Sequence, residues 1–429
     1  MFWGRQFSKC VVQKLLEKLV QVKLRRTRPV IIGVTGSFGK TTTKEAVYEV
    51  LKTKWKVYRN PKSLNTEIGL LLAILEQPSG FRSPLKWTAI LARAAANAFF
   101  GKKYDFLILE YGADKPGDIA HLTSVVKPHV GIITHIARVH QNKDQFKNEQ
   151  EVFEEKKHLV TCLKKGDMAI LNADDEQLKK LDGKLLAKTF WFSANKHDKA
   201  DIWLSDAKNT PRGFSATLHK GSQKEHWDFT IAGAFHASSL MPALLCGTLY
   251  NIPLREGIDA LQSFQLPPGR MTIIEGKNGA TLLDSTYNAS PETVKQALGL
   301  LKDFPGKRKI AVLGSMNELG DYTQEGHQEV GEQIGSWVDM LVTVGDFAKI
   351  IAESALKNGF PKARIKILSV AQEAGEFLLK EGIIEGDVIL LKGSQNAVRL
   401  ERTVKLLMAH PEKAKDLLCR QETVWEKIK

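Results

Sequence analysis

The fold of this 429-residue chain is decided by the segment Val34-Thr35-Gly36-Ser37-Phe38-Gly39-Lys40-Thr41-Thr42. It follows a short apolar run, Val30–Val34, and precedes a stretch with helical character from about Thr41 to Lys52. A glycine-rich turn between a strand and a helix presents backbone N–H groups and the positive end of the helix dipole to an anion. The position of the segment therefore predicts a phosphate-binding loop at the edge of a parallel sheet.

The loop residues have distinct expected roles. Lys40 would bridge the terminal phosphates of a bound nucleotide, and the hydroxyl of Thr41 would bind Mg²⁺. The usual pattern begins with a glycine, whose place Val34 takes here. A fortuitous turn before a helix remains the alternative, and ATP or GTP is the expected ligand. The predicted nucleotide-binding residues of the loop are Thr35, Gly36, Ser37, Phe38, Gly39, Lys40, Thr41 and Thr42.

Apolar runs and helical stretches alternate after Pro29, which predicts a mostly parallel sheet covered on both faces. The more polar stretch Ser193–Thr230 predicts small strands at the side of this domain. Pro84–Phe100 is one of the expected helices. The expected strands are Val30–Val34, Phe106–Glu110, Val130–Ile133 and Met168–Leu171.

A second set of buried strands follows Leu266-Pro267-Pro268-Gly269, whose prolines and glycine indicate a linker. These strands are Lys309–Gly314, Met340–Gly345 and Asp387–Lys392. The predicted fold class is therefore α/β. A P-loop-type central domain with a mostly parallel sheet would span residues 30–266, and a smaller Rossmann-like C-terminal domain would span residues 267–429.

Residues 1–29 stand apart, with eight Lys or Arg against a single acid, Glu17. An apolar helical face is formed by Val11, Val12, Leu15, Leu16, Leu19 and Val20. Two interpretations follow: a basic amphipathic helix lying on an anionic membrane, or a helix packed on the neighbouring domain with its lysines in water.

Composition excludes several classes of protein. The shares of apolar residues, 43%, and of charged residues, 26%, indicate a globular chain, and the net charge of +14 reports on nonspecific attraction rather than on a site. The four cysteines have no metal-ligand spacing, no zinc-finger or RNP pattern occurs, and no apolar run reaches the roughly 18 residues of a membrane span. We therefore expect free thiols, no specific nucleic acid, and a cytoplasmic protein that at most lies on a membrane surface.

Seven segments resemble, in the same order, motifs of the Mur ligase family, and of its MurF-like branch in particular. In ITHIARVH, His135 and Ala137 replace the family's Asn and Gly, and Ser315 replaces an Asp. Phe235 and Ser239 stand where the family has His and Asn. The seven segments are Thr35–Lys44, Leu64–Gly69, Leu109–Thr123, Ile133–His140, Asp284–Val294, Gly314–Gly331 and Leu390–Glu401.

The resemblance implies two magnesium ions beside ATP. Glu110 and His140 each follow an expected strand, so both would lie at the carboxyl edge of the sheet, where α/β proteins bind ligands. They would hold a second Mg²⁺ beside the one on Thr41, as the resemblance implies. The alternative for Glu110 is a solvated acid at the end of a strand.

Family members also carry a carbamylated lysine that bridges the magnesium ions. By register this lysine is Lys156, or Lys157 if the register is off by one. Modification needs a neutral amine and hence a depressed pKa. The alternative is an exposed helix lysine among glutamates.

The resemblance also assigns residues beyond the loop. Arg270, after the linker, would reach back to the γ-phosphate or the acyl phosphate. Asp284 and Asn288 would contact the nucleotide. The expected catalytic residues are Lys40, His140, Lys156 and Arg270. The expected substrate-binding residues are Asn65, Ser290, Lys392 and Ser394.

The implied activity is ATP-dependent amide ligation through an acyl phosphate, with D-alanyl-D-alanine or a similar amine added to a muramyl-peptide-like acceptor. Only 29 residues precede the ATP-binding domain, too few for the family's UDP-binding domain. We therefore expect looser acceptor recognition, recognition through a partner, or another acceptor, for example a lipid-linked one. The alternatives are a folyl or poly-γ-glutamate amide ligase, a catalytically silent nucleotide-binding scaffold, and a nucleic-acid-binding ATPase.

Overall fold

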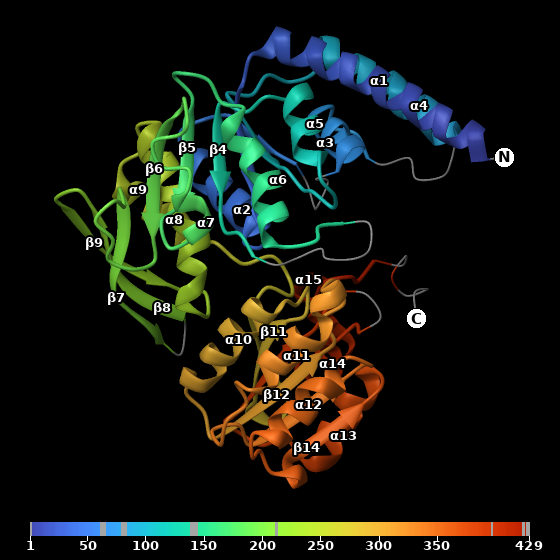
Figure 1. The fold of residues 1–429 in the computed structure, drawn as a ribbon, viewed down its shortest axis with the longest axis vertical. Helices are drawn as coiled ribbons and strands as arrows, with labels where there is room; N and C mark the ends of the chain where they lie inside the picture. The colour runs from blue at the N-terminus through green and yellow to red at the C-terminus, as the bar shows by residue number, and fades with distance from the viewer. Residues whose placement is uncertain are drawn as a thin grey trace.

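A computed structural model describes residues 2–60, 66–78, 84–137, 145–210, 213–395, 398–422 and 425. Two sheets organise these residues, one in each half of the chain (Figure 1). Both sheets are built mainly from short parallel strands that alternate with helices, so the predicted α/β fold class is confirmed. The limits predicted for the domains stay a prediction, and limited proteolysis around residues 266–269 would check them directly.

The first sheet has nine strands in the order β2-β3-β1-β4-β5-β6-β7-β8-β9. Strands β2 to β7 pair in parallel, and β7, β8 and β9 pair antiparallel. The polar stretch predicted to form side strands thus continues the same sheet, because β7 pairs with β6. The strands are β1 (Val30–Thr35), β2 (Val57–Arg59), β3 (Phe106–Glu110), β4 (Val130–Ile133), β5 (Met168–Asn172), β6 (Lys188–Ser193), β7 (Ile202–Thr210), β8 (Gly213–Lys220) and β9 (Gln223–Phe229).

Helices cover both faces of this sheet (Figure 1). One face packs on an apolar cluster with α1, α3, α4, α5 and α6, and the other packs on α2, α8 and α9. Buried apolar strands between two helical layers are the physical reason for the uninterrupted apolar runs in the sequence. The helices are α1 (Phe2–Thr27), α2 (Lys40–Leu51), α3 (Glu67–Ile74), α4 (Pro84–Phe100), α5 (Asp118–Val125), α6 (Glu149–Thr161), α7 (Glu176–Lys179), α8 (Ala237–Leu249) and α9 (Leu254–Leu261).

The second sheet has six strands in the order β10-β11-β15-β12-β13-β14, all parallel except β10. Its strands are β10 (Thr272–Glu275), β11 (Thr281–Ser285), β12 (Arg308–Gly314), β13 (Met340–Val344), β14 (Ile365–Leu368) and β15 (Asp387–Lys392). Its helices are α10 (Pro291–Asp303), α11 (Thr323–Gly331), α12 (Ala348–Lys357), α13 (Ala371–Glu381), α14 (Glu401–Leu407) and α15 (Ala414–Leu417).

Helix α1 packs against α3 and α4 on the first half of the chain (Figure 1). Leu16, Leu19 and Val20 are buried, whereas Val11 and Leu15 of the predicted apolar face are exposed. The packed interpretation therefore describes this helix, with a narrower buried face than the sequence indicated. In the described part of the chain, no helix is both long enough and apolar enough to cross a membrane.

Candidate functional site

The phosphate loop lies between β1 and α2, at the carboxyl edge of the first sheet. Gly36 has φ +148°, and a Cβ there would lie 2.0 Å from Oγ1 of Thr134. Gly39 has φ +81° as the N-cap of α2, and a Cβ there would lie 2.7 Å from Oγ of Ser239. Since both backbone conformations favour glycine and both positions lack space, the loop tolerates no side chain at either place.

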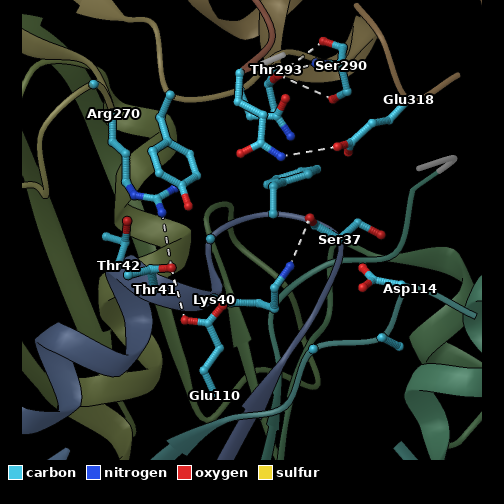
Figure 2. A pocket seen from close by; sticks show the side chains of 18 of the residues that line it. Ser37, Lys40, Thr41, Thr42, Glu110, Asp114, Arg270, Ser290, Thr293 and Glu318 are labelled. Atoms are coloured by element: carbon cyan, nitrogen blue, oxygen red, sulfur yellow. Dashed lines mark hydrogen bonds between the residues drawn. The ribbon is translucent and has the colours of Figure 1, made fainter. Parts of the chain in front are cut away.

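The side chains of the loop make two separate sets of contacts (Figure 2). Nζ of Lys40 donates to the carbonyls of Gly36 at 2.7 Å and Ser37 at 3.3 Å. Thr41 donates from Oγ1 to Oε2 of Glu110 at 3.0 Å. Glu110 ends β3, which neighbours β1 in the sheet, and this adjacency brings the buried carboxylate to the loop. Burial lowers the pKa of Lys40, while nearby Glu110 opposes this effect.

Arg270 links the second half of the chain to this loop. Its Nη2 donates to Oγ1 of Thr41 at 3.1 Å, across 229 positions in the sequence. The guanidinium lies 3.8 Å from the ring centroid of Tyr287, which holds it in place by a cation–π contact. Its Nε is buried and has no hydrogen-bond partner among the described residues. This donor is available for an anionic ligand in the cleft.

A cleft of ≈ 940 Å³ lies between the two halves of the chain. Figure 2 shows Lys40, Thr41 and Glu110 on one wall and Ser290, Thr293 and Glu318 on the opposite wall. The loop residues Ser37, Phe38, Gly39, Lys40, Thr41 and Thr42 all line it. Thr35 and Gly36 are not among its lining residues; the hydroxyl of Thr35 is buried and donates to the carbonyl of Tyr111 at 2.8 Å.

Lys156 is buried on α6 and has no hydrogen bond or ion pair to another described residue. Burial, and then the charge of Lys40, lower the pKa of Lys156 to about 7, although Glu155, Asp114 and Glu110 act in the opposite direction. The neutral amine is therefore far more accessible near neutral pH than it is for an exposed lysine. Lys157 instead forms an ion pair with Glu154 at 2.5 Å. The two candidate lysines thus differ clearly in environment.

The opposite wall of the cleft is built around the ends of β11 and β15. Nζ of Lys392 donates to the carbonyl of Asn288 at 2.9 Å and to Oγ of Ser285 at 3.2 Å. Burial, and then the charge of Arg270, lower the pKa of Lys392 to about 7. Asp284 is buried nearby, and burial raises the pKa of its carboxyl to about 6.

Asn288 and Ser290 line the cleft at the start of α10. The backbone N–H of Ser290 donates to Oγ1 of Thr293 at 3.0 Å, so these two residues cap the helix for each other. Ser394 is placed differently from its neighbour Lys392. It is buried outside the cleft lining, and its hydroxyl accepts a hydrogen bond from the N–H of Asn317 at 3.0 Å.

Two predicted site residues, Asn65 and His140, lie outside the described residues. Among the residues that are described, no group of three or more His, Cys, Asp or Glu could hold a metal ion. The metal ligands predicted here include a hydroxyl and a modified lysine, neither of which belongs to such a group. The pair that the structure does bring together is Thr41 and Glu110.

The cleft also contains residues that the sequence did not single out as site residues. His236 lines it with a buried Nε2 that has no partner among the described residues, and burial and the charges of Lys392 and Arg270 lower its pKa to about 3. Glu318 also lines the cleft, and its position in the segment Gly314–Gly331 could have marked it as a site residue. Trp87 of α4 also lines the cleft, as does Leu72, and no local sequence pattern marks Trp87 as a site residue.

The departures from the quoted motifs have structural roles. Nδ1 of His135 lies 3.1 Å from Oδ2 of Asp175, and its ring packs against Phe38 with centroids 4.5 Å apart. Oγ of Ser315 accepts from the N–H groups of Phe347 and Ala348, both at 3.1 Å, and so caps the start of α12. Neither change touches the contacts among Lys40, Thr41 and Glu110.

The side chains and backbone groups of the cleft suit a polyanionic ligand that contacts both halves of the chain. Backbone N–H groups and the N-terminal end of α2 face the cleft from below, and Lys40, Arg270 and Lys392 add three cations. The lowered pKa of the buried Lys392 and the unpaired Nε donor of Arg270 indicate a site that completes its interactions when an anionic ligand binds.

Comparisons with known proteins cover most of the chain. A model of the Mur ligase middle domain matches residues 34–247, and a model of the Mur ligase glutamate ligase domain matches residues 269–395. These two segments contain Lys40, Thr41, Glu110, Arg270 and Lys392.

Three relatives illustrate the similarity. The UDP-N-acetylmuramoyl-tripeptide–D-alanyl-D-alanine ligase of Synechocystis sp. is 30% identical, over 88% of this chain and 74% of the relative. The enzyme of the same name from Bacillus subtilis is 28% identical, over 92% of this chain and 79% of the relative. The crystal structure of MurF ligase from Thermotoga maritima in complex with ADP is 28% identical, with a TM-score of 0.76, and covers 94% of this chain and 84% of that one.

Proposed function

This chain belongs to the Mur ligase family, and on that premise we propose that it joins a carboxylate to an amine at the expense of ATP, forming ADP and phosphate. The proposed acceptor is a muramyl-peptide-like carboxylate in cell-wall precursor synthesis, and the proposed amine is D-alanyl-D-alanine or a similar dipeptide. The observation that carries the proposal is the contact chain Arg270–Thr41–Glu110, which joins both walls of the cleft at the phosphate loop.

The relatives support ATP as the nucleotide and this reaction as the activity. The Thermotoga maritima structure holds ADP, and the Synechocystis and Bacillus subtilis proteins carry the ligase name. On this chain, we assign the phosphates to the loop from Gly36 to Thr42. Arg270, Asp284 and Asn288 would contact the nucleotide from the opposite wall.

Mg²⁺ fits the residues present. Oγ1 of Thr41 and a carboxylate oxygen of Glu110 lie 3.0 Å apart, and both are the hard oxygen donors that this ion prefers. Bound there, Mg²⁺ would neutralise phosphate charge and orient the terminal phosphoryl group. A second ion on His140 and a carbamylated Lys156 stays a prediction.

The chain's own residues account for the two chemical steps. A carboxylate oxygen of the acceptor attacks the γ-phosphorus, the bond to the β-phosphate oxygen breaks, and ADP forms with an acyl phosphate. Lys40 and Arg270 neutralise the transferring charge from opposite walls. The amine nitrogen then attacks the acyl carbon, phosphate leaves, and the amine loses a proton as the amide forms. Enclosure between the walls keeps water from the acyl phosphate.

Lys156 is the proposed site of carbamylation. It is buried, lacks a partner among the described residues and lies near Asp114 and Lys40, whereas Lys157 is already paired. A neutral amine adds CO₂ and loses a proton to give a carbamate. The carbamate places a carboxylate group at the end of the Lys156 side chain. A ¹³C carbamate signal after incubation with labelled bicarbonate is expected in the wild type and in Lys157→Gln. Its persistence in Lys156→Gln would refute the assignment.

The proposal extends to the location of the protein and to a partner. The protein would work in the cytoplasm, with its first helix at a membrane surface, and a partner would share in recognising the acceptor. Pull-down of the intact protein from cells, followed by identification of bound proteins, tests the last point. Absence of any partner at stoichiometric level would count against it.

The reaction is tested by a panel of acceptors and amines with product mass as the readout. UDP-N-acetylmuramoyl tripeptide with D-alanyl-D-alanine should give a new amide, and a folate with glutamate should not. Lys40→Ala should lower amide formation below a tenth of wild type, because the terminal phosphates lose their cation. Lys52→Ala, an exposed lysine at the end of α2, is the matched control. If folate with glutamate gave product and the muramyl peptide with D-alanyl-D-alanine did not, the chain would be a folyl-type ligase.

A further inference from the structure

The positive charge of this chain is concentrated in two segments. Residues 1–28 hold eight Lys or Arg and one acid, and residues 84–103 hold four Lys or Arg and no acid. Together these 48 residues carry eleven of the fourteen net positive charges of the whole chain. The remaining 381 residues are therefore close to neutral, so the basic character belongs to one part of the molecule.

The two segments form one layer, which we call the α1–α4 layer. Both helices lie at the end of the molecule opposite the C-terminal sheet (Figure 1). Arg26 donates to the carbonyls of Ala98 at 3.0 Å and Gly101 at 2.7 Å, and Lys23 donates to Oδ1 of Asn97 at 2.6 Å. The C-terminal turns of both helices meet in these contacts, and α1 and α4 lie side by side at this end of the molecule (Figure 1).

The outer surface of the α1–α4 layer is basic. Glu17 is the one acid of the two segments, and it lies beside His121 at 3.5 Å, toward α5. The exposed cations include four on α1 and its end and four on α4 and the turn after it. They are Lys14, Lys18, Arg25, Arg28, Lys86, Arg93, Lys102 and Lys103.

Large apolar side chains lie among these cations. Phe99 and Phe100, at the end of α4, are 53% and 88% exposed, and Val11 and Leu15 on α1 are 52% and 42% exposed. Exposed aromatic and aliphatic groups beside Lys and Arg are typical of surfaces that lie in the headgroup region of a bilayer. A nucleic acid would use the cations and the aromatic rings, but it would leave Val11 and Leu15 in water.

We propose that the α1–α4 layer docks on an anionic lipid bilayer, with its cations at the headgroups and Phe99 and Phe100 inserted below them. The contact is peripheral, since no described helix could cross a membrane. The lining of the cleft includes the apolar residues Leu72, Trp87 and Leu122, and Trp87 belongs to α4 itself. Docking through this layer would therefore bring these apolar lining residues toward the bilayer. The proposal does not depend on the reaction that the cleft performs.

Sedimentation of the full chain with vesicles tests the proposal. Binding is expected to phosphatidylcholine vesicles that contain phosphatidylglycerol and not to phosphatidylcholine alone. It should weaken in concentrated salt, because the screening length shortens to about 3 Å at 1 M. Equal binding to both vesicle types would overturn the proposal, and so would binding to a single-stranded RNA that anionic vesicles fail to displace.

Variants separate the contribution of the cations to vesicle binding from that of the exposed phenylalanines. Each cation near an anionic surface strengthens binding about fivefold, so Lys14→Glu with Lys18→Glu should weaken vesicle binding at least about tenfold. Phe99→Ala with Phe100→Ala should weaken it at low and high salt alike. The matched controls are Lys357→Glu with Lys362→Glu, and Leu186→Ala, at exposed positions outside the layer. Unchanged binding in both layer variants, or equal losses in the controls, would refute the proposal. Ligation in solution measures the proposed reaction separately.

Discussion

Asp284 is a carboxyl group that folding removes from water on the C-terminal wall of the cleft. Its Oδ1 accepts hydrogen bonds from the N–H of Thr286 at 3.1 Å and the hydroxyl of the same residue at 2.7 Å. Its Oδ2 is buried with no partner among the described residues. The two bonds stabilise the charge less than burial destabilises it, and the pKa rises to about 6.

The raised pKa predicts how stability depends on pH. The folded state holds the proton more tightly than the unfolded state, whose ordinary value is 3.8, so ionisation costs stability at pH values above about 6. The cost is at most about 3 kcal/mol, and it fades as the pH falls from about 6 toward 4. Asp284→Asn should therefore raise the free energy of unfolding at pH 8 and change it little near pH 4.

Urea unfolding of the Asp284→Asn variant at both pH values checks this expectation. Asp303→Asn, at an exposed position in the same half of the chain, provides the control. A change of the same size at both pH values, or a loss of stability at pH 8, would show that the ionised carboxyl has a partner in the folded protein. Either result would contradict the pKa shift assigned to burial.

At the scale of elements, α1 is attached to its neighbours by a buried lysine. Nζ of Lys23 donates to the carbonyl of Ile74 at 2.8 Å, Oε1 of Glu76 at 2.9 Å and Oδ1 of Asn97 at 2.6 Å. Burial lowers the pKa of Lys23, and the pairing with Glu76 opposes that effect. A lysine in the buried face could not be predicted from apolar spacing, because its burial depends on oxygens from α4, from the end of α3 and from the segment after α3.

Lys23→Met should destabilise the protein by about 1–3 kcal/mol, because it leaves three oxygens without their donor. Lys18→Met, at an exposed position of the same helix, should change stability by less than about 0.5 kcal/mol. Chemical unfolding of both variants measures the difference. Equal stabilities would mean that α1 packs without the help of this polar contact.

A second link between elements fixes α6, the helix that carries the buried Lys156. The carboxylate of Glu155 accepts from the N–H groups of Gly117 at 2.6 Å and Ile119 at 2.5 Å, at the start of α5. This contact fixes α6 against the loop that carries Asp114. Such a contact between helices cannot be read from spacing, because it joins positions that are 36 and 38 residues apart.

For the whole molecule, most of the fold was predictable and part of the site was not. Buried parallel strands leave uninterrupted apolar runs, so β1, β3, β4 and β15 were predicted within a residue of their observed bounds. Because β3 and β1 are parallel neighbours, Glu110 at the end of β3 lies beside the phosphate loop that follows β1. Only the resemblance suggested that Arg270 reaches back toward the phosphates, and its contact with Thr41 was not predicted, since local pattern does not show how two domains meet.

Some cleft residues carry no local sequence pattern, because the folding of the two halves against each other brings them to the cleft. Two arginines lie close to the ring of Tyr287, Arg270 at 3.8 Å and Arg420 at 5.4 Å from its centroid, and Arg420 also donates to the backbone carbonyl of Tyr287. Trp87 and His236 come from segments far apart in the chain. Their roles in the site, like those of all the residues assigned above, stay predictions until activity is measured.

The central claim is that one cleft couples ATP cleavage to amide formation, and phosphate release from Mg-ATP tests it most directly. The measurement uses UDP-N-acetylmuramoyl tripeptide with and without D-alanyl-D-alanine, on the wild type and on Lys40→Ala. Sustained release is predicted only when both substrates are present, since the acyl phosphate turns over only after the amine attacks. Equal release without either substrate, or undiminished release by Lys40→Ala, would contradict the account.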